Sequence, residues 1–380
     1  MRKVYVVGVG MTKVGKHTEV SMRDLAAEAI SNALDEVGNE KPEAIVVGNM
    51  LSSLVEQENL AALIADHAGL RGICGLKVEG ACGSGGVAVL TGYLMVASGL
   101  YSKVLVVGVE KLLERPTPDT LRGLAYAADA DYELIYGVSF AGLNALIMRY
   151  YMSKYNVKRE ELALWSVMMH QNGVKNPYAQ LRNEITLETV LNSPVVADPI
   201  RLYDACPLSD GAAAIYLTNE DWKKLSDTPV LIAGVSNAVD SPDLSSRFSL
   251  DELFASRLSA ENALRMAKLS VKDVDVAEIH DAYTITAAVS LESIGFAEKG
   301  KAAKLWSEGR FKPGDKPTIN PSGGLKSRGH PVGATGVYQV AEVVMQLRGD
   351  FPGVLVPAEV GLTQNVGGVG SNVTTVLLKR

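Results

Sequence analysis

Cysteine is scarce in this sequence of 380 residues, which contains only three. The number is odd and the residues lack the short spacing of metal ligands, so we expect neither a disulfide framework nor a metal site. No run of about 18 apolar residues occurs, and no membrane span is expected. The first residues also lack the pattern of a signal peptide. We therefore expect a soluble, cytoplasmic protein.

Positive charge is not in excess either, since the formal net charge at pH 7 is -6. A chain with this balance has no general attraction to nucleic acid or to an anionic membrane. Hydrophobic residues make up 47% of the sequence. Together with the length, this content is sufficient for two separate cores, and two domain-sized units are the expectation.

The order of predicted elements occurs twice along the chain, which indicates an internal repeat. Each half opens with a buried strand and an amphipathic helix, and then has a second strand, a glycine-rich turn leading into an apolar helix, and a further strand. We place these segments at 3–9, 21–34, 44–47, 78–100 and 103–109 in the first half, and at 230–235, 256–268, 274–279, 322–347 and 373–378 in the second. Such a duplication predicts an α/β fold with two packed sheets and helices between and outside them. A pseudo-twofold axis would bring the two glycine-rich turns face to face.

The alternation breaks down between residues 112 and 209. Proline-containing loop sequence surrounds two segments with helical patterns, 141–152 and 160–172. We interpret 112–209 as an insertion in the first half, which the strand 212–217 then completes. The predicted domains are residues 1–228, with this inserted loop domain, and residues 229–380. A loop-rich lobe of this kind is a natural ligand-binding surface.

The first glycine-rich turn carries a cysteine, in the sequence VEGACGSGGVAV from Val78 to Val89. Cys82 lies directly before the apolar helix. A helix N-terminus favours a thiolate through its unpaired N–H groups and its macrodipole. The turn therefore predicts a nucleophilic cysteine, although a free cysteine can also be simply a small buried side chain.

Two histidines of the second half lie in distinctive settings. His280 follows a strand in the sequence EIHDAYT, and His330 is part of NPSGGLKSRGHPVGATG. Either one alone could belong to an ordinary turn. Together with Cys82 at the equivalent turn of the repeat, they predict a site for nucleophilic catalysis with imidazole acid/base groups.

With the Cys82 turn, the His280-Asp281 pair and the GHPVGATG segment in place, the whole chain resembles the thiolase superfamily. The His-Asp pair and the sequence before His330 are most similar to the sterol-carrier-protein-2 type of thiolase and its archaeal relatives. The resemblance implies a five-layer αβαβα sandwich and a homodimer or homotetramer. It also implies the activity of an acetyl-CoA C-acetyltransferase, which condenses two acetyl-CoA molecules to acetoacetyl-CoA through an acetyl-cysteine, feeding the mevalonate pathway.

The residue types suggest roles in such a reaction. Cys82 would hold the acyl group, His330 would deprotonate Cys82, and His280 would polarise the second thioester and is a candidate for the carbon base. The backbone amide of Cys82 and an amide of the loop 366–370, for which we choose Gly368, would form an oxyanion hole. We expect Asp281 and Asn320 to be supporting residues.

In one respect the sequence departs from the family. Many thiolases carry a second catalytic cysteine in a C-terminal turn, and the sterol-carrier type often has one directly after His-Asp. This chain has Ala282 after Asp281, and its other cysteines, Cys74 and Cys206, lie outside the matching motifs. The sequence therefore predicts that a histidine takes the acid/base role for the second substrate.

The resemblance also implies ligands and partners. Coenzyme A thioesters would be substrates, with no permanently bound cofactor, and the residues that bind coenzyme A stay unknown. Basic side chains of the inserted lobe are candidates, although no motif singles one out: Arg122, Lys154, Lys158 and Arg159. Archaeal thiolases are associated with hydroxymethylglutaryl-CoA synthase (HMG-CoA synthase) through a small zinc-containing OB-fold bridging protein, so this complex is expected here.

Other functions remain open at this point. The chain could be a 3-ketoacyl-CoA thiolase of fatty-acid degradation, or a lipid-transfer or retro-aldolase relative in which Tyr283 is the acid/base. A condensing ketoacyl synthase and a non-enzymatic scaffold are further alternatives. Labelling of Cys82 that acetyl-CoA blocks would exclude the scaffold.

Overall fold

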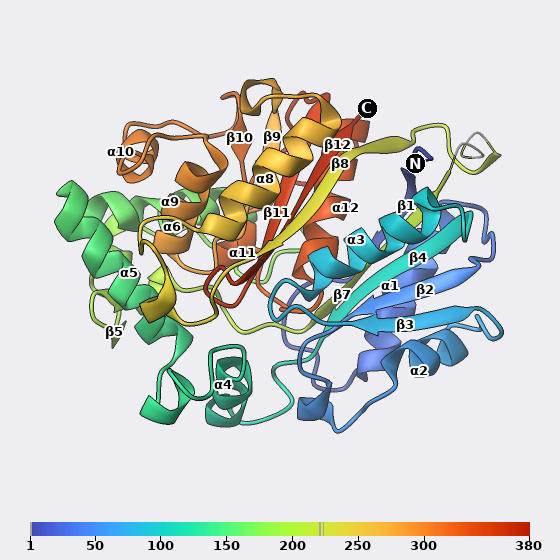
Figure 1. Cartoon of the computed structure of the whole chain (residues 1–380), viewed down its shortest axis with the longest axis horizontal. Coiled ribbons are helices and arrows are strands. Elements are labelled where there is room, and N and C mark those ends of the chain that lie inside the picture. The colour runs from blue at the N-terminus through green and yellow to red at the C-terminus, as the bar shows by residue number, and fades with distance from the viewer. Residues whose placement is uncertain (1, 220–221, 223) are drawn as a thin grey trace.

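The computed structural model describes residues 2–219, 222 and 224–380, and the same elements recur in the two halves of the chain (Figure 1). The first half contains β1 (Tyr5–Met11), α1 (Met22–Asp35), β2 (Ala44–Gly48), α2 (Leu60–His67), β3 (Cys74–Val78), α3 (Ser84–Ala97), β4 (Lys103–Glu110) and β7 (Gly211–Thr218). The second half contains β8 (Val230–Val239), α8 (Phe254–Ala267), β9 (Val276–Glu278), α9 (Thr284–Ile294), α10 (Ala302–Ser307), β10 (Thr318–Ile319), α11 (Gly324–Ser327), α12 (Thr335–Arg348), β11 (Val360–Gly367) and β12 (Asn372–Lys379).

The strands follow the same order in both halves. Among the described residues they form a 10-stranded sheet with the order β10-β9-β11-β12-β8-β1-β7-β4-β2-β3. From the centre outward, β1, β7, β4, β2 and β3 thus correspond to β8, β12, β11, β9 and β10. The two halves join where β1 pairs antiparallel with β8, Tyr5 opposite Leu231 and Val6 opposite Val230. The predicted repeat is confirmed, and its two sheets are joined edge to edge.

Five layers result from how the helices cover these strands. Helices α3 and α12 pack against each other and contact strands of both halves, so they form the central layer. Helices α1 and α2 cover the outer face of the first half, and α8 covers β8 and β12 of the second (Figure 1). The expected five-layer αβαβα sandwich is therefore the observed fold.

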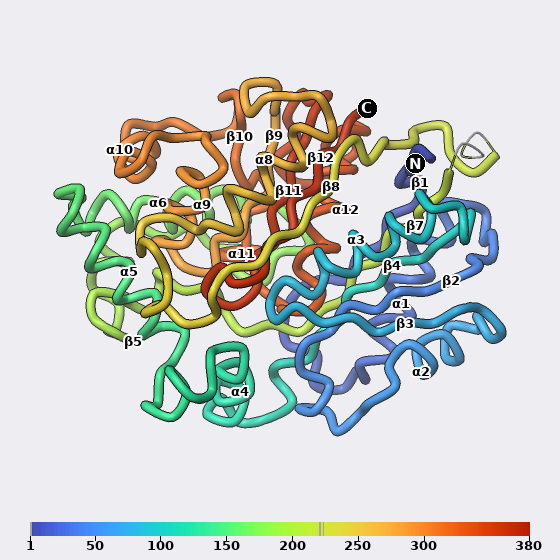
Figure 2. The backbone as a smooth tube through the Cα atoms, viewed as in Figure 1, coloured from blue at the N-terminus to red at the C-terminus, as the bar shows by residue number. Residues whose placement is uncertain are grey.

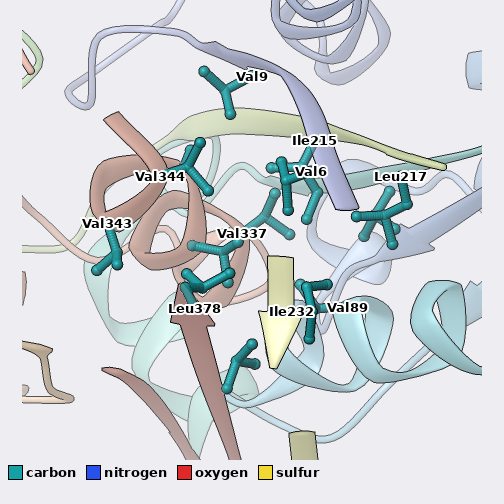
Figure 3. Close-up of a cluster of buried hydrophobic side chains, with 14 of the residues drawn as sticks. Val6, Val9, Val89, Ile215, Leu217, Ile232, Val337, Val343, Val344 and Leu378 are labelled. Atoms are coloured by element: carbon teal, nitrogen blue, oxygen red, sulfur yellow. The ribbon is translucent and has the colours of Figure 1, made fainter. Parts of the chain in front are cut away.

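Alternating apolar residues explain why each sheet is covered on both faces. In β4, Val104 and Val106 belong to the core cluster that includes α3 and α12, whereas Leu105 and Val107 belong to the cluster that includes α1. This follows from the period of two along a strand. Figure 3 shows part of the central cluster, where Val89 of α3 and Val337 of α12 lie among strand side chains from both halves.

The inserted lobe lies between β4 and β7 along the chain, as predicted. It contains α4 (Thr117–Ala125), α5 (Phe140–Tyr155), α6 (Arg159–Gly173), α7 (Leu187–Leu191), β5 (Val195–Ala197) and β6 (Ile200–Arg201). Although its sequence interrupts the first half, α5 and α6 pack against α9 of the second half (Figure 2). Trp165 and Met148 share a core cluster with Ile279. The lobe thus lies against the chain that leads to His280.

Five of the strands that the structure describes are absent from the elements predicted from the sequence: β3, β5, β6, β10 and β11. Of the two longer ones, β3 is an edge of the sheet and is half-exposed, and β11 runs to Gly367. The prediction of a loop over 366–370 is wrong at its start, because the loop begins only at Gly368. Within the described residues, none of the helices has both the length and the apolar character needed to cross a lipid bilayer.

Candidate active site

The Cys82 turn connects β3 to α3. Ala81 adopts a left-handed conformation with φ of 54°, which few non-glycine residues do without a local constraint. Ser84 provides this constraint, because its hydroxyl accepts from Gly80 N at 3.0 Å and donates to Ala81 O at 2.6 Å. Cys82 is thereby held two residues before the first residue of α3, partly exposed.

The two glycine-rich turns meet where α3 and α12 begin. A Cβ atom on Gly85 would lie only 2.7 Å from the backbone nitrogen of Gly336, so a side chain at this position would separate the helices. Cys82 itself packs against a small cluster of Leu51, Leu112 and Val332, and Val332 lies two residues after His330. The two equivalent turns of the repeat are therefore face to face, as the sequence predicts.

His330 is buried and held at both its backbone and its ring. Its backbone N–H donates to Ser209 Oγ at 2.9 Å, and its Nδ1 lies 2.6 Å from Thr335 Oγ1. The Thr335 hydroxyl donates its own hydrogen to Pro331 O at 3.1 Å, so it accepts from the imidazole. Nδ1 of His330 therefore carries the proton, and Nε2 keeps a free lone pair.

His280 has the opposite tautomer. It lies two residues after β9, where the side chain of Asn320 accepts from Ile279 N at 2.7 Å and fixes the end of the strand. The backbone N–H of Val366 and the side-chain amide of Asn365 both donate to Nδ1 of His280, each at 3.3 Å. Nδ1 is an acceptor here, so Nε2 carries the proton and is a hydrogen-bond donor.

The two imidazole rings are in contact. Their centroids are 4.8 Å apart and their planes meet at 89°. Burial lowers the pKa of His280 to about 3, with a smaller effect of Arg328. Burial, the neighbouring His280 and Arg328 hold the pKa of His330 well below its usual range. Both rings are therefore neutral near pH 7, one with a free lone pair and one with a free N–H.

The protonation of Cys82 differs from the expectation. The sequence predicts that the helix N-terminus favours a thiolate, but burial and then the charge of Glu110 raise the pKa of the Cys82 thiol to about 12. Hydrogen bonds from the backbone N–H groups of Gly368 and of Cys82 itself oppose this rise without reversing it. Desolvation thus outweighs the helix terminus, so the thiol must lose its proton during the reaction.

The residues predicted to support catalysis are Gly368, Asp281 and Asn320. The backbone N–H groups of Gly368 and of Cys82 itself lower the pKa of the Cys82 thiol through hydrogen bonds, so Gly368 lies beside this thiol. Asp281 accepts from Trp165 Nε1 at 2.9 Å and from Leu325 N at 2.7 Å. Burial raises the pKa of Asp281 to about 6. Asp281 and Asn320 therefore hold the backbone around His280.

Asn365 was missed as a site residue. Its side-chain amide donates to Cys82 O at 3.1 Å as well as to His280, and its Oδ1 accepts from Gly86 N at 2.9 Å. It therefore ties the cysteine turn to the histidine. The polar run from Thr363 to Asn365 is fully buried in the structure but looks like loop sequence, so only a recognised strand there would have pointed to it.

Glu110 was also missed. This buried carboxyl group at the end of β4 accepts from Met50 N at 2.9 Å, Leu51 N at 3.2 Å and Gly333 N at 3.1 Å. It thereby ties the turn after His330 to the first half. Burial raises its pKa to about 7. A charged residue at the end of an otherwise apolar strand was the available signal.

Two of the basic candidates for coenzyme A have partners within the protein. Lys154 pairs with Asp251 at 2.7 Å, and Arg159 pairs with the buried carboxylate of Asp204. Arg122, at the end of α4, and Lys158, before α6, are exposed.

Comparisons with known proteins agree with this geometry. Residues 4–221 match the family model described as thiolase, N-terminal domain, and residues 236–380 match the one described as thiolase C-terminal domain-like. The chain is 43% identical to an acetyl-CoA acetyltransferase of Methanothermobacter thermautotrophicus, over 100% of both chains. It is 32% identical to human sterol carrier protein 2, over 100% of this chain and 72% of that protein. Among solved structures, an Ltp2-ChsH2(DUF35) aldolase superposes with a TM-score of 0.85 at 22% identity, covering 99% of this chain and 97% of that one.

Proposed function

Because this chain belongs to the thiolase family and is an acyltransferase, we propose that it is an acetyl-CoA C-acetyltransferase that condenses two acetyl-CoA molecules to acetoacetyl-CoA and coenzyme A. The observation that carries the proposal is the pair of histidines in opposite tautomers beside the Cys82 turn. A Claisen condensation needs both a base for the nucleophile and a donor for a developing oxyanion.

The first half-reaction acylates Cys82. The Cys82 thiol transfers its proton to Nε2 of His330, which has the free lone pair, as the sulfur attacks the thioester carbonyl. The developing oxyanion receives the backbone N–H groups of Cys82 and Gly368. The carbon–sulfur bond to coenzyme A then breaks, the departing sulfur takes up a proton that the α-carbon of the second substrate later replaces, and an acetyl group remains on Cys82.

The second half-reaction forms the carbon–carbon bond. Nε2–H of His280 donates to the thioester oxygen of the second acetyl-CoA, which stabilises the enolate formed by loss of an α-proton. The enolate carbon attacks the acetyl group on Cys82. When the tetrahedral intermediate collapses, the Cys82 thiolate recovers its proton from His330.

The wider context is also part of the proposal. Acetoacetyl-CoA formation is uphill, so an enzyme that consumes the product would draw the reaction forward. This favours transfer to HMG-CoA synthase in a mevalonate pathway, with a small zinc-containing OB-fold protein as the bridge. The three cysteines are free thiols in the structure, which is consistent with a cytoplasmic location.

A homo-oligomer is proposed for a structural reason. Strand β3 is an edge of the sheet, and its Leu76 is 41% exposed. Exposed strand edges pair readily with another chain, and a second copy of β3 is a fitting partner. Light scattering should give at least a dimer at micromolar concentration, and a monomer would contradict the proposal.

The test of the activity is mass spectrometry of the protein after incubation with acetyl-CoA, together with an assay for acetoacetyl-CoA. We expect an acetyl adduct on the tryptic peptide that contains Cys82, and product formation. Cys82→Ala should abolish both while its melting temperature stays close to that of the wild type, and Cys74→Ala, at the sheet edge, serves as the matched control. Turnover by Cys82→Ala, or an adduct on another cysteine, would overturn the proposal.

A further inference from the structure

The condensation needs a base for the α-carbon of the second substrate, and His280 is poorly suited to this role. Its Nδ1 is occupied by the N–H of Val366 and the amide of Asn365, and its Nε2 already carries the proton. A group with this arrangement donates a hydrogen bond and does not accept a proton. The cysteine that the sterol-carrier type often has directly after His-Asp is also missing here, because residue 282, two positions after His280, is alanine.

A thiol nevertheless lies beside position 282. The backbone N–H of Cys206 donates to Ala282 O at 2.9 Å, and the neighbouring Ala205 forms an antiparallel bridge with Tyr283. On the other side, Leu208 forms a parallel bridge with His330. The short segment 205–208 therefore lies between the backbone that carries His280 and the backbone that carries His330. Cys206 comes from the inserted lobe, far before Ala282 in the sequence, so no motif connects the two.

The charges around Cys206 fit a thiol that changes its protonation state. Lys326 is buried, with its Nζ 3.5 Å from His170 Nε2 and over the ring of Tyr203. Burial raises the pKa of Cys206 to about 12, Lys326 lowers it, and Asp281 and Cys82 raise it. Burial in turn lowers the pKa of Lys326 to about 8, and Cys206 is the leading influence in the opposite direction. A thiolate at Cys206 thus has a buried ammonium group as its counter-charge.

We propose that Cys206 is the second catalytic thiol of this site and transfers the α-proton of the second acetyl-CoA, in place of the cysteine that relatives carry after His-Asp. The proposal rests on the proposed function. It assigns His280 to the thioester oxygen alone, and so differs from the expectation that a histidine is the carbon base.

The proton transfers balance over one turnover. As Cys82 is acylated, the carbon–sulfur bond to coenzyme A breaks, and the Cys206 thiol gives its proton to the departing sulfur. The Cys206 thiolate then takes the α-proton of the second acetyl-CoA, so that a C–H bond breaks and an S–H bond forms. The released electron pair forms the carbon–carbon bond to the acetyl group, the bond between this group and Cys82 breaks, and the Cys82 thiolate recovers the proton held by His330. Both thiols end the cycle protonated.

The test compares Cys206→Ala and Cys206→Ser with the wild type, and Cys74→Ala is the control thiol outside the site. Three rates are measured: acetylation of Cys82 in a single turnover, exchange of the acetyl-CoA α-protons in D2O, and acetoacetyl-CoA formation. We expect both Cys206 variants to acetylate Cys82 within about tenfold of the wild type. We expect them to lose α-proton exchange and condensation by about 10²-fold or more, the usual effect of removing a general base. The control should keep all three rates.

Several outcomes would overturn the proposal. Condensation by Cys206→Ala within a few-fold of the wild type would exclude Cys206 as the base. Equal loss of all three rates with a lowered melting temperature in both variants would show a structural role. The serine variant keeps the size of the side chain, so the test remains possible if the alanine variant does not fold. If the wild type forms neither an acetyl adduct nor acetoacetyl-CoA, the proposed function fails first, and the proposal for Cys206 fails with it.

Discussion

The rings of His280 and His330 meet edge to face, 4.8 Å apart at their centroids, and their free Nε2 atoms differ in protonation. His330 offers a lone pair because Thr335 accepts its Nδ1 proton, and His280 offers an N–H because Val366 donates to its Nδ1. Two residues of one type are thus given two roles by their second hydrogen bonds. This division can be tested separately in the two half-reactions.

We expect His330→Ala to slow acetylation of Cys82 by about 10²-fold or more, because no other neutral lone pair replaces its Nε2. His280→Ala should leave acetylation nearly unchanged and slow condensation by about 10²-fold, the scale of one lost oxyanion donor. His280→Gln keeps an N–H donor but offers no base, so it should recover part of the condensation rate. Single-turnover acetylation and acetoacetyl-CoA formation measure the two steps. If His280→Gln were as slow as His280→Ala, a donor role for His280 would lose its support.

Asn365 provides a second test, because its amide and the N–H of Val366 together set the tautomer of His280. In Asn365→Asp, an acceptor replaces the donor that faces His280 Nδ1 and Cys82 O. We expect the imidazole to turn its proton toward the introduced carboxylate, which leaves Nε2 without the N–H that the thioester oxygen needs. Condensation should fall by about 10²-fold.

Two measurements distinguish this effect from a general loss of structure. Histidine NMR signals should report an Nδ1–H tautomer for His280 in Asn365→Asp, and Asn262→Asp, on α8, is the control at a distant position. An unchanged tautomer together with a lowered condensation rate would contradict the explanation.

Much of this site was predictable because its motifs are local. Glycine-rich turns before apolar helices mark Cys82 and His330, and the repeat predicts that the two turns meet. The structure adds what depends on distant segments. Strand β11 was missed because Gly361 and the polar residues 363–365 interrupt its apolar pattern, and only the surrounding sandwich buries them.

The protonation states were not predictable for the same reason. A helix N-terminus is visible in the sequence and favours a thiolate, but the desolvation that raises the Cys82 pKa comes from the packing of both halves. The position of Cys206 beside Ala282 likewise depends on how the inserted lobe lies against the second half. Neither relationship leaves a pattern in the sequence around these residues.

Buried histidines should make the protein sensitive to acid. Burial lowers the pKa of His170 to about 4, with a further contribution of Lys326, whereas an unfolded histidine titrates near 6.5. Below pH 6.5 the unfolded chain therefore binds a proton that the folded protein excludes, and the free energy of unfolding falls as the pH falls. The loss from one such histidine is up to about 1.4 kcal/mol per pH unit between 6.5 and 4.

The raised pKa values of Asp281 and Glu110 act in the opposite direction. They make the free energy of unfolding fall as the pH rises through about 6 to 7. A comparison of variants removes this background. In urea unfolding between pH 4.5 and 7.5, His170→Gln should show a flatter pH dependence than the wild type on the acid side. His17→Gln, at a partly exposed histidine, is the control. Parallel curves for the wild type and His170→Gln would contradict the assignment.

Lys326 allows the role of Cys206 to be tested without removing the thiol. Its ammonium group is the cation that lowers the pKa of Cys206, whereas Asp281 and Cys82 raise it. Burial raises the pKa of Tyr283, and its interactions with both thiols raise it further. Lys326→Met keeps the length of the side chain and removes the charge. We expect the pKa of Cys206 to rise, so that condensation falls by about tenfold at pH 7 and recovers toward alkaline pH. Acetylation of Cys82 depends on His330 and should be nearly unchanged.

Lys326→Arg restores the positive charge and should restore the condensation rate at pH 7, because an electrostatic role requires a cation and not a particular side chain. Lys301→Met, at the exposed start of α10, is the matched control and should leave the profile unchanged. The measurement is acetoacetyl-CoA formation from pH 6 to 9, with single-turnover acetylation followed in parallel. A loss that is equal at every pH, or that Lys326→Arg does not reverse, would mean that Lys326 supports the fold of this region and does not set the charge on Cys206.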